Sequence, residues 1–395
     1  MNSFLKRTLI LPHLEVSRFF HAQRTLYAEC HTVRRPMACP VCASLCSQIY
    51  DKRLVSLRDE KIRQFQVVLK VWKKRYFCPQ CKKPKTEPID GVLPKRRYTQ
   101  RFRKQIYRFC EQFSSLEQVR QEMKCSKDLI YRSYYEALDL EERKRFRAFP
   151  DAIGLDEHSY RRLKHHGSYG ATEYAVMVVD HRKKRAIEVV EGKSCAALES
   201  SLTHVSHRDR VKWVTLDLCD PFKKFARSYF PQAELIADKF HVLRLLNGPL
   251  NQARKAVTGD RRSLRIRTDL LRSRFKLDYK RKREIDRFLE PFDELREIYQ
   301  WKERLHGFYR IRGAGRARRA MIKMLDEMAL SEVNAIRRLR KTLKKWFQEI
   351  LNYFKTRLTN ARVEGFNNVA KTVKKRAYGF RSFKNYRLRV LNACF

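Results

Sequence analysis

Four cysteines form two matched pairs, Cys39-Pro-Val-Cys42 and Cys78-Pro-Gln-Cys81. Two residues between the cysteines of a pair let both sulfur atoms reach one metal ion, and four thiolates complete a tetrahedral Zn²⁺ site. Such a closed site has no open position for water, so we expect a structural zinc. Four unligated cysteines are the alternative without metal. Other possible ligands nearby in the sequence are Cys30, His31 and Cys46.

Three carboxylates, Asp156, Asp217 and Glu364, have the residue type and the setting for a second kind of metal site. Asp156 lies in the strand-like run 152–160, and Asp217 lies at the end of the run 212–218. In the strand order given below these two runs are neighbours, which brings the two carboxylates together. Because uncompensated carboxylates beside a sheet are costly, their pairing implies a cation between them. A single aspartate at a strand end is ordinarily a turn or cap residue.

The segment 358–380 is expected to be a helix that carries Glu364, with Thr359 or Asn360 as its N-cap. Its apolar residues recur at helical spacing and predict a buried stripe: Val363, Phe366, Ala370 and Val373. Glu364 falls on a neighbouring polar face with Asn367 or Asn368 and Lys371. Two Mg²⁺ or Mn²⁺ ions held by the three carboxylates would support in-line displacement at phosphorus.

Asp238 and His241 form a D-x-x-H pair at the end of the run 234–240. They are candidates for an accessory role, with Asp238 as a further ligand or as a partner of a ligand. The alternative is an aspartate that ends a strand and a histidine that starts a helix.

The elements that must position these carboxylates are strands and helices in alternation. The expected strands are 152–160, 173–180, 185–192, 212–218 and 234–240, and the expected helices are 194–205 and 221–230. This order, β-β-β-α-β-α-β, indicates a mixed sheet flanked by helices and is that of the ribonuclease-H-like fold.

The first 150 residues are expected to contain a DNA-reading part. Residues 65–72 alternate as in a strand. Residues 116–123 and 127–138 are expected to be helices separated by a turn, the outline of a helix-turn-helix. Ser114 with Glu117 predicts a capping box for the first helix, and Ser126 predicts the N-cap of the second. Two short helices in an ordinary bundle are the alternative.

The chain is therefore interpreted as a multidomain α/β protein in six segments. These are an N-terminal segment (1–36), a zinc-binding module (37–93), a helix-turn-helix region (94–149), the first part of a ribonuclease-H-like catalytic core (150–240), a helical basic insertion (241–357), and the catalytic helix with the C-terminus (358–395).

The charge balance predicts a polyanionic partner. Lys and Arg number 89 against 43 Asp and Glu, a net charge of +46. Like charges repel in a folded chain, so this excess favours binding to nucleic acid. No run approaches the roughly 18 apolar residues of a membrane-spanning helix, and no signal peptide is evident. We expect no membrane partner and a cytoplasmic, nucleoid-associated protein of a bacterium.

An ordered set of motifs resembles the transposases of bacterial insertion sequences of the ISL3 family. The matching pieces are CPVC (39–42), RYFCPQC (75–81), GLDEH (154–158), VTLDL (214–218), IADKFHV (236–242), TNARVEGFNN (359–368) and KKRAYGF (374–380), together with the helix-turn-helix. The resemblance covers nearly the whole chain. It implies a ribonuclease-H-like domain interrupted by a helical insertion, with Asp156, Asp217 and Glu364 as the catalytic triad. It also implies binding to the terminal inverted repeats of double-stranded DNA, cut-and-paste or related transposition, and a homodimer or larger assembly on DNA.

Two other functions are compatible with the sequence. One is a catalytically inactive DNA-binding regulator derived from a transposase, which would need the zinc and the helix-turn-helix but no triad. The other is a nuclease or Holliday-junction resolvase of the same fold. RNA binding is disfavoured because no stacking motif of the usual RNA modules is evident.

Overall fold

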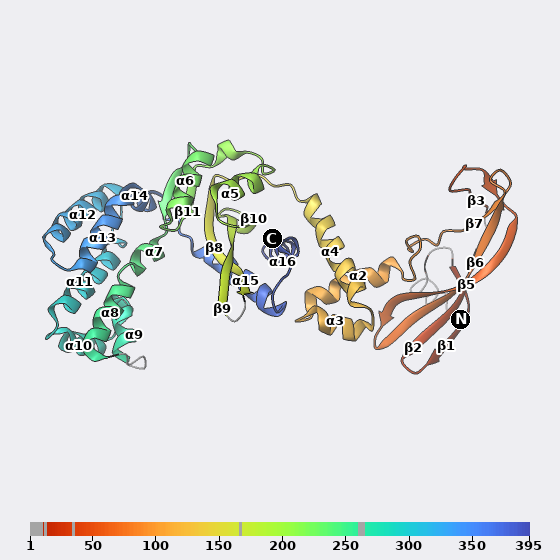
Figure 1. The fold of residues 1–395 in the computed structure, drawn as a ribbon, viewed down its shortest axis with the longest axis horizontal. Helices are drawn as coiled ribbons and strands as arrows, with labels where there is room; N and C mark the ends of the chain where they lie inside the picture. Colours follow the sequence, from red (N-terminus) through yellow and green to blue (C-terminus); the bar gives the residue numbers. More distant parts are fainter. Residues whose placement is uncertain (1–10, 12–13, 34–35, 166–167, 260–264) are drawn as a thin grey trace. The chain divides into compact units, whose positions relative to one another are not determined.

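The structure, a computed structural model, describes residues 11, 14–33, 36–165, 168–259 and 265–395. It consists of two units, Met1–Glu142 and Arg143–Phe395, each with its own β-sheet (Figure 1). The mixed α/β class is therefore confirmed. Residues 1–10, 12–13 and 34–35 of the expected N-terminal segment lie outside the described residues.

The first unit contains a five-stranded sheet in the order β1-β2-β6-β5, with β7 paired to β6. Strands β2 and β6 are parallel, and the other pairs are antiparallel. The sequence predicted no helix or strand before residue 37, so β1 and β2 are found only in the structure. The strands of this unit are β1 Leu14–Ala22, β2 Thr25–Thr32, β3 Met37–Ala38, β4 Leu45–Cys46, β5 Ile49–Ile62, β6 Phe65–Cys78 and β7 Lys83–Thr86.

Strand β6 confirms the alternation expected for residues 65–72. Val67, Leu69 and Val71 are buried in one core with Leu57 of β5, while Trp72 is 46% exposed. Alternate residues of a strand point to opposite faces, so the period of two buries one set, while Gln66, Val68 and Lys70 of the other set are half-buried.

Three helices follow the sheet: α2 Gln100–Gln112, α3 Leu116–Met123 and α4 Lys127–Lys144. The N-cap of α4 is confirmed, because the Ser126 hydroxyl accepts a hydrogen bond from Leu129 N at 3.3 Å. The capping box of α3 lies one residue later than expected. The Ser115 backbone is extended, so its hydroxyl reaches the Gln118 amide, and the Gln118 side chain accepts from Ser115 N.

A buried carboxylate joins the sheet of the first unit to α2. Asp59 on β5 is 3% exposed and accepts hydrogen bonds from the Thr99 hydroxyl at 2.6 Å and from Arg101 Nε at 3.2 Å. The same Thr99 hydroxyl caps α2 by accepting from Phe102 N. The sheet and α2 are therefore connected by polar contacts that fix where the helix begins.

The second unit is built on a sheet with the order β10-β9-β8-β11-β12. Strand β9 is antiparallel to both β8 and β10, whereas β11 runs parallel to both β8 and β12. The expected element order is confirmed, and β8 and β11 are neighbours. The strands are β8 Ala152–His165, β9 Ser168–Asp180, β10 Arg185–Glu191, β11 Trp213–Leu216 and β12 Glu234–Ala237.

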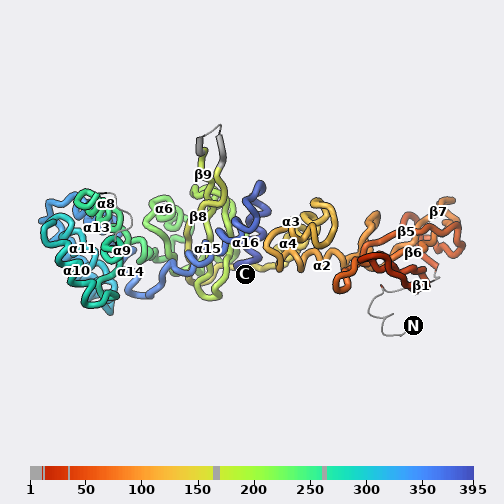
Figure 2. The backbone as a smooth tube through the Cα atoms, turned by 90° about the horizontal axis from the view of Figure 1, so that it is seen from below, coloured from red at the N-terminus to blue at the C-terminus, as the bar shows by residue number. Residues whose placement is uncertain are grey.

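Helices cover both faces of this sheet (Figure 2). On one face, α5 (Cys195–Leu202) and α6 (Asp220–Tyr229) pack on residues such as Leu155 and Val178. On the other, α15 (Ala361–Arg376) and α16 (Phe383–Ala393) pack on residues such as Met177 and Val179. The alternation along β8 and β9 supplies both cores.

A helical region separates β12 from α15, as the resemblance implied. Its helices share one hydrophobic core with α5, α6 and the face of the sheet that these two helices cover. In Figure 1, α8 to α13 lie together beyond α7. Its helices are α7 Lys239–Arg244, α8 Asn247–Thr258, α9 Arg265–Leu271, α10 Tyr279–Leu289, α11 Asp293–Phe308, α12 Ala314–Glu327, α13 Asn334–Lys345 and α14 Phe347–Thr356, and the 3-10 turns of the unit are Arg208–Arg210, Arg274–Lys276 and Met328–Leu330. No helix in the described part of the chain is long and apolar enough to cross a membrane.

Glu188 on β10 joins three parts of the second unit and predicts a stability effect. Its carboxylate is buried, and it accepts Arg387 Nε at 2.6 Å and Arg387 Nη2 at 2.7 Å, together with a contact from Arg147. Burial raises its pKa, but hydrogen bonds from His204 and Arg387 outweigh burial and lower the pKa to about 2. We expect Glu188→Gln to cost about 3–5 kcal/mol of unfolding free energy, because it leaves two arginines without their carboxylate.

The pH dependence of this effect has a definite sign. A carboxylate with a lowered folded-state pKa stabilises the fold above its ordinary pKa, and the contribution is lost as pH falls towards about 2. Urea unfolding at pH 7 and at pH 3 should therefore show a smaller gap between wild type and Glu188→Gln at pH 3. The exposed Asp209→Asn serves as control and should change neither value. An equal gap at both pH values would contradict the ionic role of Glu188.

Candidate functional site

The four cysteines of the two CxxC pairs meet at one place in the first unit. Cys39 and Cys42 flank the turn between β3 and β4, and Cys78 and Cys81 flank the turn between β6 and β7. All four sulfur atoms lie within 4.8 Å of one another, with 3.8 Å from Cys39 to Cys81 and 3.5 Å from Cys42 to Cys78. In a tetrahedral site with Zn–S bonds of about 2.3 Å, the sulfur atoms lie roughly 3.8 Å apart. The arrangement therefore fits zinc.

The electrostatics of this cluster also favour a cation. A hydrogen bond with Ser44 lowers the pKa of the Cys42 thiol to about 6, and the Cys81 amide at 3.3 Å lowers the pKa of Cys78. The neighbouring Cys42 raises the pKa of Cys81 to about 12, because a further thiolate in the cluster is unfavourable. A divalent cation removes this conflict by allowing all four thiols to ionise.

The other candidate ligands lie elsewhere or outside the group. Cys30 is buried in the sheet core with Val71, and His31 pairs with Glu15 at 2.9 Å. Cys46 packs beside the cluster, but its sulfur is not in the group of four. Among the described residues, the four predicted cysteines form the thiol group able to hold a metal.

The second unit brings Asp156 and Asp217 together. Asp156 lies on β8, and Asp217 directly follows β11, which pairs with β8 in parallel through Val214 and Ile153. Burial and then the charge of the nearby Asp217 raise the pKa of Asp156 to about 8. Asp156 is not in the group formed by Asp217, Asp238 and His241, whose ligand atoms lie within 4.8 Å of one another. Two carboxylates held this close disfavour a second negative charge, which is the setting that a divalent cation relieves.

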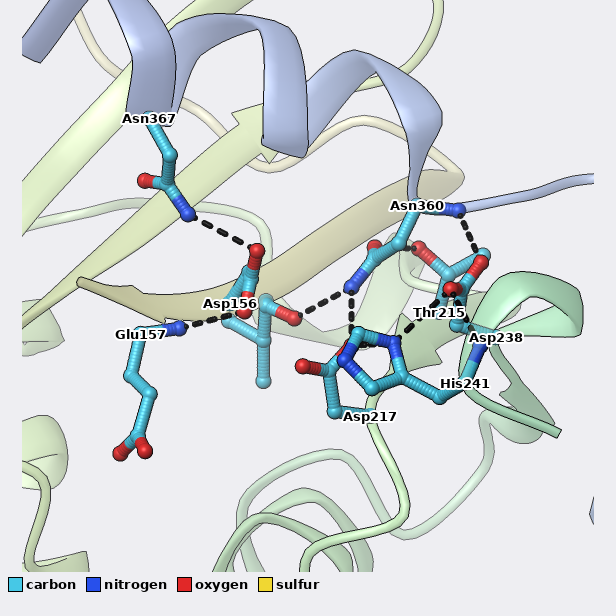
Figure 3. A network of polar contacts seen from close by, with 9 residues as sticks. Asp156, Glu157, Thr215, Asp217, Asp238, His241, Asn360 and Asn367 are labelled. Carbon is cyan, nitrogen blue, oxygen red and sulfur yellow. Dashed lines mark hydrogen bonds and ion pairs between the residues drawn. The ribbon is translucent and has the colours of Figure 1, made fainter. Parts of the chain in front are cut away.

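Two asparagines of α15 hold these carboxylates in place (Figure 3). Asn367 Nδ2 donates to Asp156 Oδ2 at 2.8 Å. Asn360 Nδ2 donates to Asp217 Oδ1 at 3.2 Å and to Leu155 O at 2.8 Å. Asn360 stands at the N-cap position but makes no side-chain cap, because its amide is engaged by the sheet. The helix is therefore docked on β8 and β11 through the same groups that orient the two aspartates.

The structure distinguishes Asn367 from Asn368 on this helix. The sequence predicted that Asn367 or Asn368 lies on the polar face with Glu364, and Asn368 is the exposed one. Asn367 is 2% exposed and shares the buried stripe with Val363 and Ala370. Phe366 is partly buried against this stripe. An asparagine is tolerated here because its amide is paired with a carboxylate.

Glu364 lies in the first turn of α15 and is exposed. Its side chain makes no hydrogen bond or ion pair with another described residue, and it is not in the acidic group that the structure assembles. Its position on the helix is nevertheless informative. It follows Asn360 by four residues and precedes Asn367 by three, and this spacing puts all three on one side of α15.

Asp238 and His241 do join the site. Asp217, Asp238 and His241 offer ligand atoms within 4.8 Å of one another, with His241 Nδ1 at 3.1 Å from Asp217 and 3.0 Å from Asp238. These two hydrogen bonds raise the pKa of His241 to about 10. Asp238 also caps α7 by accepting from His241 N, and its other oxygen accepts from Asn360 N at 3.0 Å. Its carboxylate thus connects β12, α7 and α15.

The positioning residues around the aspartates were not identified from the sequence. Thr215 on β11 donates to Asn360 Oδ1 at 2.6 Å, and the His181 ring contacts the Thr215 hydroxyl at 2.7 Å. Burial lowers the pKa of His181 to about 4, which keeps the ring neutral. The spacing of the asparagines in TNARVEGFNN around Glu364 was the available clue, since it repeats the helical period.

Gly154 on β8 is the point where α15 comes closest to the sheet, and it predicts a packing effect. A Cβ there would lie 2.5 Å from Val363 Cγ2, 2.8 Å from His181 Nε2 and 3.0 Å from Asn360 Oδ1. We expect Gly154→Ala to destabilise the second unit by about 1–3 kcal/mol, because α15 must shift off the sheet. Urea unfolding measures this change.

Gly365 provides the matched control. It lies in the interior of α15, and nothing lies within 4 Å of a Cβ built there. Alanine has a higher helix propensity than glycine, so Gly365→Ala should stabilise the protein by about 1 kcal/mol. Equal effects of the two substitutions would mean that close packing at Gly154 is not what decides the docking of α15.

Comparisons with known proteins match two stretches of the chain to protein families. Residues 153–390 match the ISL3-type DDE transposase family, described as "Transposase". Residues 35–81 match a family described as the zinc-finger of transposase IS204/IS1001/IS1096/IS1165. The transposase for insertion sequence element IS1001 of Bordetella parapertussis is 24% identical over 382 residues, which cover 93% of this chain and 91% of that protein. The chain therefore belongs to the ISL3 family of DDE transposases.

Proposed function

We propose that this protein binds the terminal inverted repeats of an insertion sequence and catalyses metal-dependent DNA cleavage and strand transfer. Asp156, Asp217 and Glu364 would hold the divalent metal ions, Mg²⁺ or Mn²⁺. The observation that carries the proposal is that Asp156 of β8 and Asp217 after β11 are both held by the start of α15, through Asn367 at 2.8 Å and Asn360 at 3.2 Å. A ribonuclease-H-like fold is supported by the strand order β10-β9-β8-β11-β12 and by the strand directions.

Glu364 is the proposed third ligand because of its place on α15. The neighbours on its side of the helix, Asn360 and Asn367, already reach Asp217 and Asp156. Its exposure leaves the carboxylate free to turn towards metal and DNA. The metal ions, when bound, would activate the attacking hydroxyl group and stabilise the leaving oxygen. The chain's own residues, Asn360 and Asn367, orient Asp217 and Asp156.

Asp238 and His241 are proposed as positioning residues. The cationic His241 ring balances part of the negative charge of Asp217, and Asp238 fixes that ring at 3.0 Å. Asp238 also holds the first residues of α15 through Asn360 N. By this arrangement the position of Asp217 depends on both residues.

The first unit is proposed as the part that recognises the ends of the element. The zinc-ribbon match, the helices α3 and α4 with the turn between them, and the net charge of +46 support binding to double-stranded DNA. Transposition requires two ends in one complex, so we propose a homodimer or larger assembly on DNA.

A plasmid assay for excision and strand transfer tests the proposal. The purified protein is supplied with the flanking ends of its own element and with Mg²⁺ or Mn²⁺. We expect excision and joining of 3′ ends to target DNA. Free ends without joining would instead support a nuclease, and specific end binding without cleavage would support an inactive regulator.

A further inference from the structure

A cavity of about 730 Å³ lies beside the carboxylate site, between α7 and the helices of the insertion. Its residues come from α7 and α8, from the segment between α9 and the 3-10 turn Arg274–Lys276, and from the end of α11. They are Lys239, Phe240, Leu243, Arg244, Asn247, Leu271, Arg272, Ser273, Lys276, His306 and Arg310.

The lining of this cavity carries uncompensated positive charge. Five of its residues are Lys or Arg, and none is Asp or Glu. Within the described part of the chain, Arg244, Arg272 and Lys276 form no ion pair, and each of them is exposed. Unpaired cations that converge on a concave surface attract phosphate groups.

A second cavity in the same insertion makes the contrast clear. It measures about 840 Å³ and is also rich in arginine, including Arg283 and Arg287. Its lining, however, includes the carboxylates of Asp286, Glu290 and Glu303, which offset the arginines. The first cavity, hereafter the α7 cavity, lacks this compensation.

One phenylalanine lines the α7 cavity, and a second contacts an arginine of its lining. Phe240 lines the cavity and is 38% exposed. Phe275, 72% exposed, lies under the guanidinium of Arg310 at 3.7 Å from the ring centroid. Proteins that bind single-stranded nucleic acid combine cations for the backbone with aromatic rings on which bases stack.

Helix α7 connects this cavity to the carboxylates. Its N-cap is Asp238, and its third residue is His241, which contacts Asp217 (Figure 3). Phe240 and Arg244, one turn apart on the same helix, line the cavity. The cavity therefore begins one residue away from Asp238 and His241, the residues proposed to position Asp217.

We propose that the α7 cavity holds an unpaired segment of the DNA substrate next to the cleavage position, with phosphates on Arg244, Arg272 and Arg310 and a base stacked on Phe240. The cavity volume is that of pockets for small ligands, which suits one or two nucleotides and excludes a double helix. This inference rests on the proposed function, because it assigns a substrate segment to the same site.

Photocrosslinking of the full-length protein tests the assignment. The probe is an oligothymidylate with a 5-iododeoxyuridine, and mapping of the crosslinked peptide identifies the stacked residue. We expect a crosslink at Phe240. Phe240→Ala should remove it and weaken oligothymidylate binding by about fivefold or more, since stacking contributes about 1–3 kcal/mol per base. Phe240→Trp should keep both, which separates loss of stacking from loss of folding.

Two double variants test whether DNA binds at the α7 cavity or is only attracted by the overall positive charge of the protein. Arg244→Ala with Arg310→Ala removes two charges from the α7 cavity, and Arg283→Ala with Arg287→Ala removes two from the other cavity. We expect the first pair to weaken binding and to lower the salt slope by about 1.4, and the second pair to leave the crosslink unchanged. Equal effects of the two pairs would overturn the proposal.

Two further outcomes are decisive. In the first, thymidine monophosphate competes with the probe for the crosslink at Phe240 as well as unlabelled oligothymidylate does at the same concentration. That result would assign the site to a free nucleotide and overturn the strand assignment. Plasmid cleavage measured in parallel distinguishes the two proposals. Cleavage by wild type with no crosslink at Phe240 overturns the α7 cavity alone, whereas a crosslink without any cleavage overturns the proposed function alone.

Discussion

Replacing Glu364 by glutamine is expected to abolish DNA cleavage and strand transfer while leaving the fold intact. Loss of a metal ligand removes several kcal/mol of transition-state stabilisation, so the rate should fall by roughly three orders of magnitude or more. Stability should change by less than about 0.5 kcal/mol, because Glu364 is exposed and makes no hydrogen bond or ion pair with another described residue. The plasmid excision assay and thermal unfolding measure the two effects.

The control for Glu364→Gln is Glu332→Gln, which removes an equally exposed carboxylate from the segment before α13. It should keep full activity. Should Glu364→Gln cleave DNA at a rate near that of wild type, Glu364 is not a ligand. The third carboxylate would then have to be sought nearer the two aspartates, and Asp238, which shares His241 with Asp217, would be the first to replace.

Replacing Cys78 by serine is expected to release zinc and to unfold the part of the first unit around β3, β4 and β7. Cys78 is fully buried, and it connects the end of β6 to the other three thiols. Structural zinc contributes about 10–16 kcal/mol to small zinc-binding folds, far more than the few remaining apolar contacts of this cluster provide. Zinc content per chain, limited proteolysis near residues 36–48 and binding to end DNA should all report the loss.

Cys46→Ser is the matched control for Cys78→Ser. Cys46 is as buried as Cys78 and packs in the same cluster, but its sulfur lies outside the group of four. It should keep one zinc ion per chain. Loss of zinc from Cys46→Ser together with retention in Cys78→Ser would reverse the ligand assignment.

Local spacing in the sequence was enough to propose the two groups of candidate metal ligands, the four cysteines and the three carboxylates. The CxxC pairs specify their own geometry, because two residues between thiols are enough for both to reach one metal. Alternation in β6 and in the runs of the second sheet gave the strands, and their order predicted that β8 and β11 are neighbours. These features depend on contacts within a few residues or on a short list of allowed connections.

Contacts between residues far apart in the chain could not be predicted from the sequence. The parallel pairing of β2 with β6 joins Cys30 to Val71, and nothing in residues 25–32 specifies that partner. The same is true of Glu188 with Arg387, and of Phe240 with Arg310 in the α7 cavity. Such contacts depend on the packing of whole elements, and many alternative partners have similar local chemistry.

The sequence by itself determined which residues are candidates for metal binding: four thiols, an aspartate within a strand, an aspartate that directly follows a strand, and a glutamate on a helix. The tertiary structure decided how the aspartates are held. Asn360 and Asn367 became their partners because α15 packs at Gly154, where only a glycine leaves room for Val363 and the Asn360 amide. Residue type and spacing define which groups can bind a metal, but their orientation and pKa depend on burial and on neighbours far along the chain.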